Sequence, residues 1–292
     1  MRAMFRRRGG SRKAGVGAII VQSPMAAPPT FRDARPHDYD AYVRLFPELG
    51  VPDALPTRER FEAEIAPTAI VAETTEVMGL AYHRTVGQTG YLHQLIVAPA
   101  ARGAGVGLEL MRRAAARMVD ASCTRIQLAT KPDNHTALAL YRSAGLEVQY
   151  RVWSLGLTWE AAARLPVGAA TSREATAADD AEIERAARLI SGLVAQRRAM
   201  PHRVLLVTGR GARITGFAVF DPTFPGAAPF YAEAVEDAAA LLRAMRSRAR
   251  PEDADVSVMV ERDASLVEAL RAHGAHTKLE VVRLEGPLPL TR

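Results

Sequence analysis

Hydrophobic and polar positions in the first half of the chain switch between two periods, and the switches predict a mixed α/β domain. Alternating or continuous apolar runs predict strands at 30–34, 69–73, 77–84, 91–97, 125–130 and 149–157. Apolar residues at helical spacing, Leu108, Met111, Ala115 and Met118 among them, predict helices at 38–46, 105–119 and 134–143, with a further one around Phe61 and Ile65. The order predicts a central, mostly antiparallel sheet flanked by helices.

The second half repeats this layout. Helices are predicted at 180–196, 231–245 and 264–272, and strands at 204–207, 214–220, 256–260 and 278–284. The stretch VSVMVERDASLVEALRAHGA is a diverged copy of IQLATKPDNHTALALYRSAGL in the first half. Two copies of about 130 residues each suit two tandem domains better than a solenoid of short repeats.

Composition sets the domain boundaries. Residues 159–178 are rich in alanine, contain Pro166 and Gly168, and are expected to be a junction. We therefore expect a basic, disordered extension at 1–25, a first domain at 26–158 and a second domain at 179–292, with Met25 as an alternative start to Met1.

Overall composition excludes several classes of protein. Of the 292 residues, 48% are hydrophobic and 24% charged, as in soluble globular proteins. No apolar run approaches the roughly 18–20 residues of a membrane span, so we expect no membrane partner. A single cysteine, Cys123, excludes a disulfide scaffold and a Cys/His zinc cage, and we expect no metal.

The net charge of +6 comes from one end of the chain. Residues 1–13 include basic residues but no acidic one. These basic residues account for the whole excess of positive charge, so the remaining sequence is formally neutral. A nucleic-acid-binding protein would spread positive charge over a folded face. Nucleic acid is therefore not an expected partner, except through weak contact with this arm. No export signal is evident, and a cytoplasmic location is expected.

Candidate chemistry concentrates in YLHQLIVAPAARGAGVGLELMRRAA, residues 91–115. A strand runs into a loop with Gly103, Gly105 and Gly107, and the loop opens a helix. Glycine lets a ligand approach the backbone, and a helix start presents unpaired N–H groups to a phosphate. The P-loop and the dinucleotide fingerprint both fail here, because no Lys-Ser/Thr pair follows and Leu108 occupies the third glycine position. What remains is Arg-x-x-Gly-x-Gly beginning at Arg102.

This arrangement resembles the acetyl-CoA-binding motif of the GNAT superfamily of N-acetyltransferases, [RQ]-x-x-G-x-[GA]. A second block, DNHTALALYRSAGL at 133–146, resembles the later motif of the family, and the likeness covers about residues 31–157. It implies a GNAT fold with a splayed strand pair, acetyl-CoA as co-substrate and direct transfer to a primary amine in a ternary complex. It also implies that the second domain is a degenerate GNAT-like copy.

The same resemblance assigns site residues. Tyr141 would protonate the leaving thiolate, and Asn134 would contact the cofactor or an ordered water. The remaining cofactor-binding residues implied by the resemblance are Leu95, Ile96, Val97, Arg102, Gly103, Ala104, Gly105, Val106, Gly107 and Leu108. Plainer interpretations stay open: Tyr141 as a core aromatic, Asn134 as a helix N-cap and Arg102 as a solvated loop charge.

The catalytic base is less defined. Some relatives carry a glutamate where this chain has Ala129, whereas LHQLIV resembles the LHALAV strand of serotonin N-acetyltransferases, where a histidine removes the proton. His93 matches that histidine, and strand alternation would place it on the same face as Leu95 and Val97. Alternatively, His93 is a strand residue without a catalytic role. Glu73 and His83 are then the substitute bases.

Two further interpretations follow from the remaining residues. Cys123 lies away from the motifs with no evident base, so no acyl-enzyme is expected. The second domain has DPTFPGAAPFYAEA where a glycine loop would stand, with Leu270 or Arg271 at the position of Tyr141 and Asp263 or Ala264 at that of Asn134. Its expected role is to cover the first domain and shape the acceptor cleft, or to bind a second ligand or a protein.

The leading hypothesis is an acetyl-CoA-dependent N-acetyltransferase acting on a small-molecule or peptide amine. A sensor that binds acetyl-CoA without turnover is the alternative, and an RNA tether formed by the basic arm is a third. The acceptor stays open, and the duplication is compatible with a monomer or a homodimer.

Overall fold

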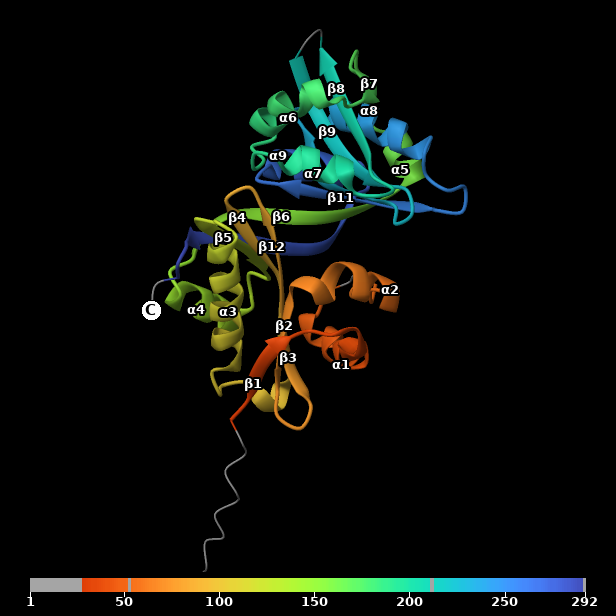
Figure 1. Ribbon diagram of the computed structural model, residues 1–292. Coiled ribbons are helices and arrows are strands. Elements are labelled where there is room, and N and C mark those ends of the chain that lie inside the picture. The colour runs from red at the N-terminus through yellow and green to blue at the C-terminus, as the bar shows by residue number, and fades with distance from the viewer. Residues whose placement is uncertain (1–27, 52–53, 211–212, 291–292) are drawn as a thin grey trace, which may run out of the picture.

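Two lobes of the chain are joined at a narrow waist in the computed structural model, which describes residues 28–51, 54–210 and 213–290 (Figure 1). We call the lobe formed by residues up to 158 the first lobe and the lobe formed by the rest the second lobe. The basic extension predicted at 1–25, with the alternative start Met25, lies outside the described residues. No helix in the described ranges has the length and apolar character needed to cross a bilayer.

The first lobe follows the predicted order of elements closely. Its strands are β1 (Thr30–Asp33), β2 (Ala69–Glu73), β3 (Val77–Val86), β4 (Thr89–Val97), β5 (Arg125–Thr130) and β6 (Glu147–Thr158). Its helices are α1 (Tyr39–Leu45), α2 (Arg58–Arg60), which runs into a π-turn at Phe61–Ile65, α3 (Val106–Asp120) and α4 (His135–Ser143). The predicted strand and helix positions are thus confirmed to within a few residues.

The second lobe has the same succession of elements. Its strands are β7 (Thr171–Glu174), β8 (Val204–Arg210), β9 (Arg213–Asp221), β10 (Gly226–Ala232), β11 (Asp255–Glu261) and β12 (His276–Pro287). Its helices are α5 (Trp159–Ala163), α6 (Asp180–Ala186), α7 (Leu193–Ala199), α8 (Val235–Arg246) and α9 (Ala264–Ala272). Residues 159–178, expected to be a junction, thus contain α5 and β7.

Two predicted helices of the second lobe differ in the structure. The helix expected at 180–196 is two helices, α6 and α7, separated where Arg188 and Gly192 adopt left-handed φ values of 51° and 86°. The helix expected at 231–245 begins only at Val235, and the residues before it form strand β10. Pro229 and the small residues around it have low strand propensity, which hid β10 from the sequence pattern.

The two lobes share one sheet through an exchange of strands. The twelve strands run in the order β1-β2-β3-β4-β5-β12-β6-β11-β10-β9-β8-β7. The last strand, β12, lies between β5 and β6 of the first lobe, and β6 lies between β12 and β11. The order reads the same from both ends when the two copies are interchanged. Each copy therefore completes the sheet of the other, and the two copies form a single continuous sheet.

The two copies also share an ion pair and a helix cap at matching positions. In the first copy Arg32 pairs through both guanidinium nitrogens with Asp38, at 2.7 and 2.9 Å, and in the second copy Arg173 pairs likewise with Asp179, at 2.8 and 2.7 Å. Helices α4 and α9 are capped alike, since Asn134 accepts from the amide of Ala137 at 3.1 Å and Asp263 from that of Leu266 at 2.9 Å. These matched details confirm the predicted duplication.

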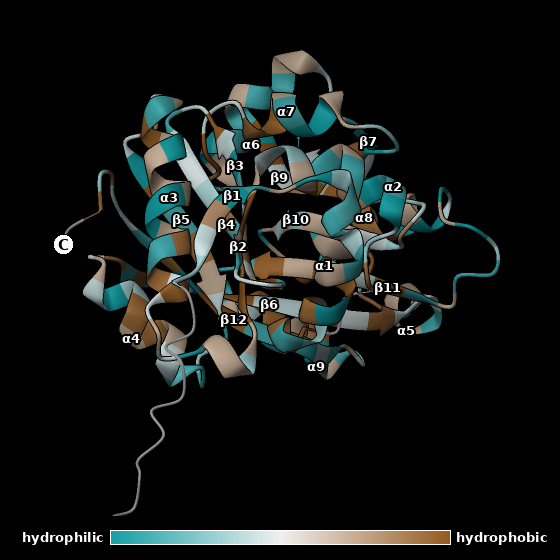
Figure 2. Ribbon diagram, turned by 60° about the horizontal axis from the view of Figure 1, so that its bottom comes forward, coloured by the Kyte–Doolittle hydropathy of each residue, from teal (hydrophilic) through white to brown (hydrophobic). Residues whose placement is uncertain are grey.

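Hydrophobic residues concentrate in the strands and on the helix sides that face them, whereas hydrophilic residues occupy the outward turns (Figure 2). One buried cluster packs α3 and α4 on the first-lobe strands, and it includes Leu284 of β12. A second cluster fills the second lobe, and it includes Leu157 of β6. The exchanged strands therefore supply core residues to the opposite lobe.

This exchange predicts that a core residue near the C-terminus stabilises the first lobe. Leu284 is fully buried, so Leu284→Ala is expected to lower the free energy of unfolding by about 2–5 kcal/mol. Denaturant unfolding measures the loss, and Val167→Ala, at a side chain that is 77% exposed, is the control expected to change little. A Leu284→Ala protein as stable as the wild type would contradict the exchange.

Candidate functional site

Strands β4 and β5 separate part-way along their length. They pair in parallel only from Thr89 with Arg125 to Leu92 with Leu128, and β4 continues to Val97 without β5. Ala98 donates its amide to Met78 of β3 at 2.8 Å. Alternation along an antiparallel ladder then turns the peptide groups of Leu95 and Val97 into the gap, whereas those of Ile96 face β3. The splayed pair implied by the motifs is therefore present.

The glycine loop lies at the end of β4. Gly103 and Gly105 have φ values of 79° and 80°, and a Cβ atom at either would meet nothing within 4 Å. Gly105 is the N-cap of α3 and offers no side-chain cap. Within the described chain, no well-formed hydrogen bond engages the backbone amides from Gly103 to Leu108, and the first bond of α3 runs from Glu109 to Gly105. The result is an open row of donors at the positive end of a helix.

Arg102 differs from the other residues of the loop. Its amide donates to Pro99 at 3.2 Å and is therefore occupied. Its guanidinium bonds the carbonyl of Val97 at 3.1 Å and the carboxylate of Glu48 at 2.5 Å, which fixes the entry to the loop. The arginine of the motif thus holds the loop in place in this structure.

Helix α4 brings Asn134 and Tyr141 to the same side of the sheet as α3. The Asn134 carbonyl caps the helix, and its amide nitrogen is left free to donate. Tyr141 is 7% exposed and belongs to the buried cluster against which Leu95 and Val97 pack. Burial raises the pKa of its phenol to about 12, so the hydroxyl keeps its proton at neutral pH.

His93 faces the other side of β4. A bulge lies where Gln94 pairs with Tyr82 and Leu92 with His83, which leaves His93 as the extra residue. Its ring stacks on that of Tyr82, with centroids 5.3 Å apart, whereas Leu92 packs in the α3 cluster. The expected placement of His93 on the face of Leu95 and Val97 is therefore wrong, because a bulge breaks strand alternation.

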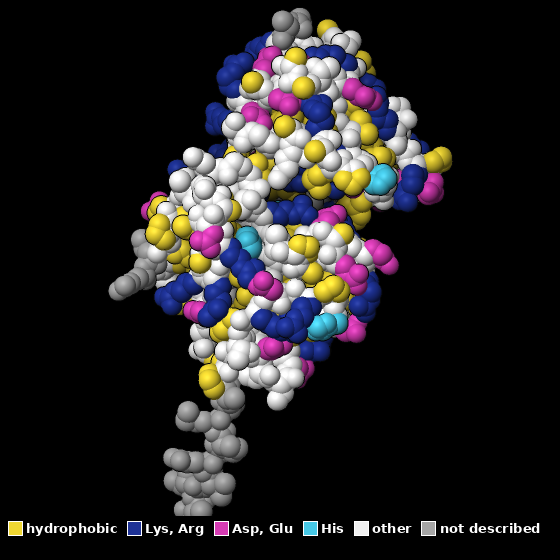
Figure 3. All heavy atoms as spheres, viewed as in Figure 1, with side chains coloured by type: hydrophobic (Ala, Val, Ile, Leu, Met, Phe, Trp, Pro, Cys, Tyr) yellow, Lys and Arg dark blue, Asp and Glu magenta, His cyan; other side chains and the backbone are white. Residues whose placement is uncertain are grey.

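The surroundings of His93 are strongly positive. Its side chain remains exposed, yet its pKa falls from 6.5 to about 3, through desolvation and then through the charges of Arg84, Arg197 and Arg283. Its ring lies beside those of Tyr82 and Tyr91, and the charge of Arg197 acts on it from the second lobe, so His93 lies where the two lobes meet. Figure 3 shows Lys and Arg side chains in the recess between the two lobes.

The depressed pKa of His93 predicts a pH dependence of stability. Between pH 6.5 and about 3 the unfolded chain binds a proton at this histidine and the folded chain does not, so stability falls as the pH falls through that window. We expect wild type to lose more stability than His93→Gln between about pH 7.5 and pH 5. Urea unfolding of both proteins at both pH values measures the difference, and equal losses would contradict it.

The two substitute bases, Glu73 and His83, and the cysteine have surroundings that differ from those of His93 and Tyr141. Glu73 is held by Arg32 at 2.7 and 2.9 Å, and this pairing lowers its pKa. His83 is 6% exposed, its Nδ1 has no partner, and desolvation lowers its pKa. Cys123 is buried in the α3 cluster, and burial raises the pKa of its thiol, so it is protonated at neutral pH. Among the described residues, none of the three forms a hydrogen bond with His93 or Tyr141.

The second lobe lacks the loop and the tyrosine. Strand β10 passes into α8 through only Glu233 and Ala234, and the first turn of α8 carries Glu236 and the buried Asp237, which repel a phosphate. The matched caps align Tyr141 with Leu270, which is fully buried. The second copy therefore differs from the first at both of these candidate positions.

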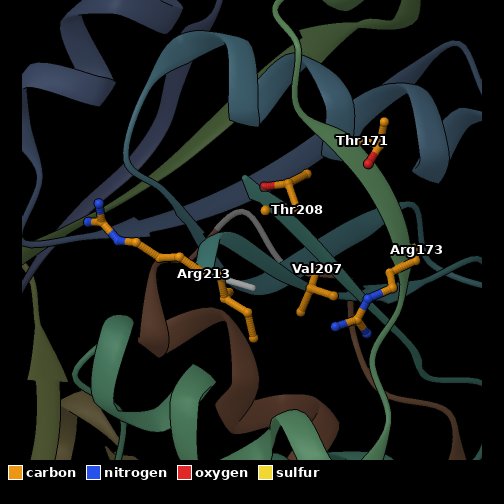
Figure 4. A pocket seen from close by; sticks show the side chains of 7 residues that line it. Thr171, Arg173, Val207, Thr208 and Arg213 are labelled. Atoms are coloured by element: carbon orange, nitrogen blue, oxygen red, sulfur yellow. The ribbon is translucent and has the colours of Figure 1, made fainter. Parts of the chain in front are cut away.

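A small hollow of about 110 Å³ lies elsewhere in the second lobe (Figure 4). It is lined by Thr171, Arg173, Val207, Thr208, Gly209, Arg213 and Ile214, from strands β7, β8 and β9. These strands are at the opposite end of the sheet from the gap, and the hollow is separate from the site. In the described ranges, no three His, Cys, Asp or Glu side chains are grouped to hold a metal ion.

Comparisons with known proteins agree with this geometry. The sequence model of the acetyltransferase (GNAT) family matches residues 32–146, whereas no curated protein matches the chain. A GCN5-related N-acetyltransferase from Sphaerobacter thermophilus shares 18% identity over 89% of this chain and 95% of its own, with a TM-score of 0.65. An acetyltransferase-like protein of Pyrococcus horikoshii shares 17% identity over 91% and 92%, with a TM-score of 0.63. A tandem GNAT protein from the clavulanic acid biosynthesis pathway shares 13% over 90% and 100%, with a TM-score of 0.58.

Proposed function

We propose that the chain transfers an acetyl group directly from acetyl-CoA to a primary amine in a ternary complex. The match of residues 32–146 to the sequence model of the acetyltransferase (GNAT) family supports this proposal. One observation carries the proposal: an open row of backbone donors at the start of α3 lies directly beside the gap between β4 and β5. Residues 26–158 would form the catalytic domain, completed by strand β12.

The residues of the site fit coenzyme A. The free amides from Gly103 to Leu108 would bind the diphosphate, and the two left-handed glycines leave room for it. The peptide groups of Leu95 and the amide of Val97 would pair with the pantetheine arm as an added strand, since the carbonyl of Val97 already accepts from Arg102. The free amide nitrogen of Asn134 would donate to the same arm. When bound, the thioester supplies the acetyl group.

Two side chains would handle protons on opposite faces of β4. Tyr141, with its proton held at neutral pH, would donate it to the departing thiolate. His93 is neutral throughout the physiological range and would accept a hydrogen bond from the amine. The gap in the sheet lies between them, so the acceptor would approach from the face of His93 while the thiol lies on the face of Tyr141.

The second lobe would cover the acceptor side. Gln196 of α7 donates to the carbonyl of Thr85 in β3 at 3.3 Å, which ties α7 to the end of the β3–β4 hairpin. Arg197, the next residue on α7, is close enough to His93 to lower its pKa. A degenerate copy would thus act as a wall of the acceptor cleft.

Release of free CoA thiol from acetyl-CoA in the presence of a panel of amines tests the proposed function. We expect thiol release to depend on an amine and to match, mole for mole, the acetylated product found by mass spectrometry. Tight binding of acetyl-CoA with no transfer to any amine would instead support a sensor.

A further inference from the structure

Four arginines from both lobes converge on the recess at His93. Arg84 comes from β3, Arg283 from the exchanged strand β12, Arg197 from α7 and Arg203 from the segment before β8. Arg84 lies over the ring of Tyr82, 5.6 Å from its centroid, and His93 stacks on the same ring. The pKa of Arg197 is lowered by desolvation and by Arg84, which places the two cations close together.

Three of these cations have a carboxylate partner and the fourth has none. Arg84 pairs with Glu64 at 2.9 Å, Arg283 with Glu261 at 3.3 Å, and Arg203 with Asp221. Among the described residues no carboxylate lies within 4 Å of Arg197, whose guanidinium donates a hydrogen bond to the sulfur of Met200 at 3.5 Å. The Nε atoms of Arg197 and Arg283 are buried with no hydrogen-bond partner.

A half-buried guanidinium beside other cations is costly unless an anion joins it. The diphosphate of coenzyme A is not that anion, because its proposed seat is at α3, on the other face of β4. The recess instead lies where the acceptor would enter, with the rings of Tyr82 and Tyr91 beside His93 at 5.3 and 6.0 Å. The anion would therefore arrive as part of the acceptor.

We propose that the acceptor amine also carries an anionic group, a carboxylate or a phosphate, which Arg197 binds together with its neighbours in the recess. This inference rests on the proposed acetyl transfer and names the substrate class for it. A guanidinium binds either anion through two parallel hydrogen bonds, and polyamines and lysine-rich peptides are repelled. The same anion would offset the charges that depress the pKa of His93, so binding of the correct acceptor would make that imidazole more basic.

Matched acceptor pairs test this proposal on the full chain loaded with CoA. β-Alanine is compared with β-alaninamide, and O-phosphoethanolamine with ethanolamine, with spermidine as the cationic probe. Calorimetry gives each Kd, and acetyl-CoA turnover gives each kcat/KM. We expect the anionic member of at least one pair to be favoured at least about tenfold, in line with a charge-assisted hydrogen bond, and the better pair identifies the carboxylate or the phosphate.

Variants test whether Arg197 gives rise to the preference for an anionic acceptor. Arg197→Gln is expected to remove it, Arg197→Lys to restore part of it, and Arg243→Gln, at an exposed arginine of α8, to leave it unchanged. CoA affinity should be the same in all three. No preference in either pair, tighter binding of spermidine, or a preference that survives Arg197→Gln would overturn the proposal.

Failure of the proposed substrate class can be told apart from failure of the proposed function. Acetyl transfer to neutral amines without an anionic preference would leave the proposed function standing and remove the substrate class. Binding of the anionic probes through Arg197 without transfer to any amine would overturn the proposed function, and with it the acceptor role, and would leave only an anion-binding site in the recess.

Discussion

Replacing Tyr141 by phenylalanine is expected to lower kcat by about 10²–10⁴-fold while CoA affinity stays within a factor of two or so, because the substitution removes one proton donor and no binding contact. The phenol is buried, its pKa is raised to about 12, and it lies in the cluster against which Leu95 and Val97 of β4 pack. Steady-state kinetics with calorimetric CoA binding measures both quantities.

A second tyrosine provides the control for this substitution. Tyr231 of β10 also has a pKa raised to about 12, but it lies in the degenerate copy and its hydroxyl contacts Glu233 at 3.2 Å. Tyr231→Phe should leave kcat unchanged. If Tyr141→Phe kept wild-type kcat, Tyr141 would be the core aromatic that its burial alone allows, and the proton would come from water.

Replacing Gly105 by valine is expected to weaken CoA binding at least about 100-fold, since a branched side chain would stand over the row of amides and displace several charge-assisted hydrogen bonds. The residue caps α3 at a φ of 80°, a conformation that costs a side chain about 1–2 kcal/mol. Calorimetry measures the affinity, and thermal unfolding measures the cost in stability.

A matched substitution at Gly192 separates the effect on CoA affinity from the effect on stability. It caps α7 with a φ of 86° and, like Gly105, has nothing within 4 Å of a Cβ position. Gly192→Val should lose similar stability and keep wild-type CoA affinity. Equal losses of affinity in the two variants would mean that the backbone amides at α3 are not the diphosphate site.

Local features of the site could be predicted from the sequence. The strand, glycine loop and helix of residues 91–115 occur in the predicted order, and Asn134 caps the helix that carries Tyr141. These features depend on neighbouring residues, since glycine conformations and caps are set within a few positions. The availability of the amides at α3 follows from the same short-range rules.

Features that depend on distant contacts could not be predicted. The side of β4 on which the His93 side chain lies depends on a bulge in the pairing of β4 with β3. No residue pattern in the sequence indicates this bulge. The exchange of β6 and β12 follows from pairings across the whole chain, and with it come Arg283 and Leu284 at the first lobe. Arg197 reaches the recess only because the second lobe folds over the first.

A short repeat in the sequence marks the beginning of each copy. TFRDARPHD at 30–38 and TSREATAAD at 171–179 share an arginine and an aspartate at the same spacing, and these residues form the bidentate pair that opens each copy. The spacing would have indicated where the second copy begins, inside the expected junction. Alanine content does not mark this boundary, because β7 is a short, mostly polar edge strand.

Titration of the ¹⁵N-labelled chain with CoA, followed by amide NMR, tests whether the start of α3 is the diphosphate site. We expect the amides from Gly103 to Leu108 to shift most, together with those of Leu95 and Val97, and the β10–α8 junction at Glu233 and Ala234 not to respond. Shifts centred on the second lobe, or saturation without any change at the start of α3, would contradict it.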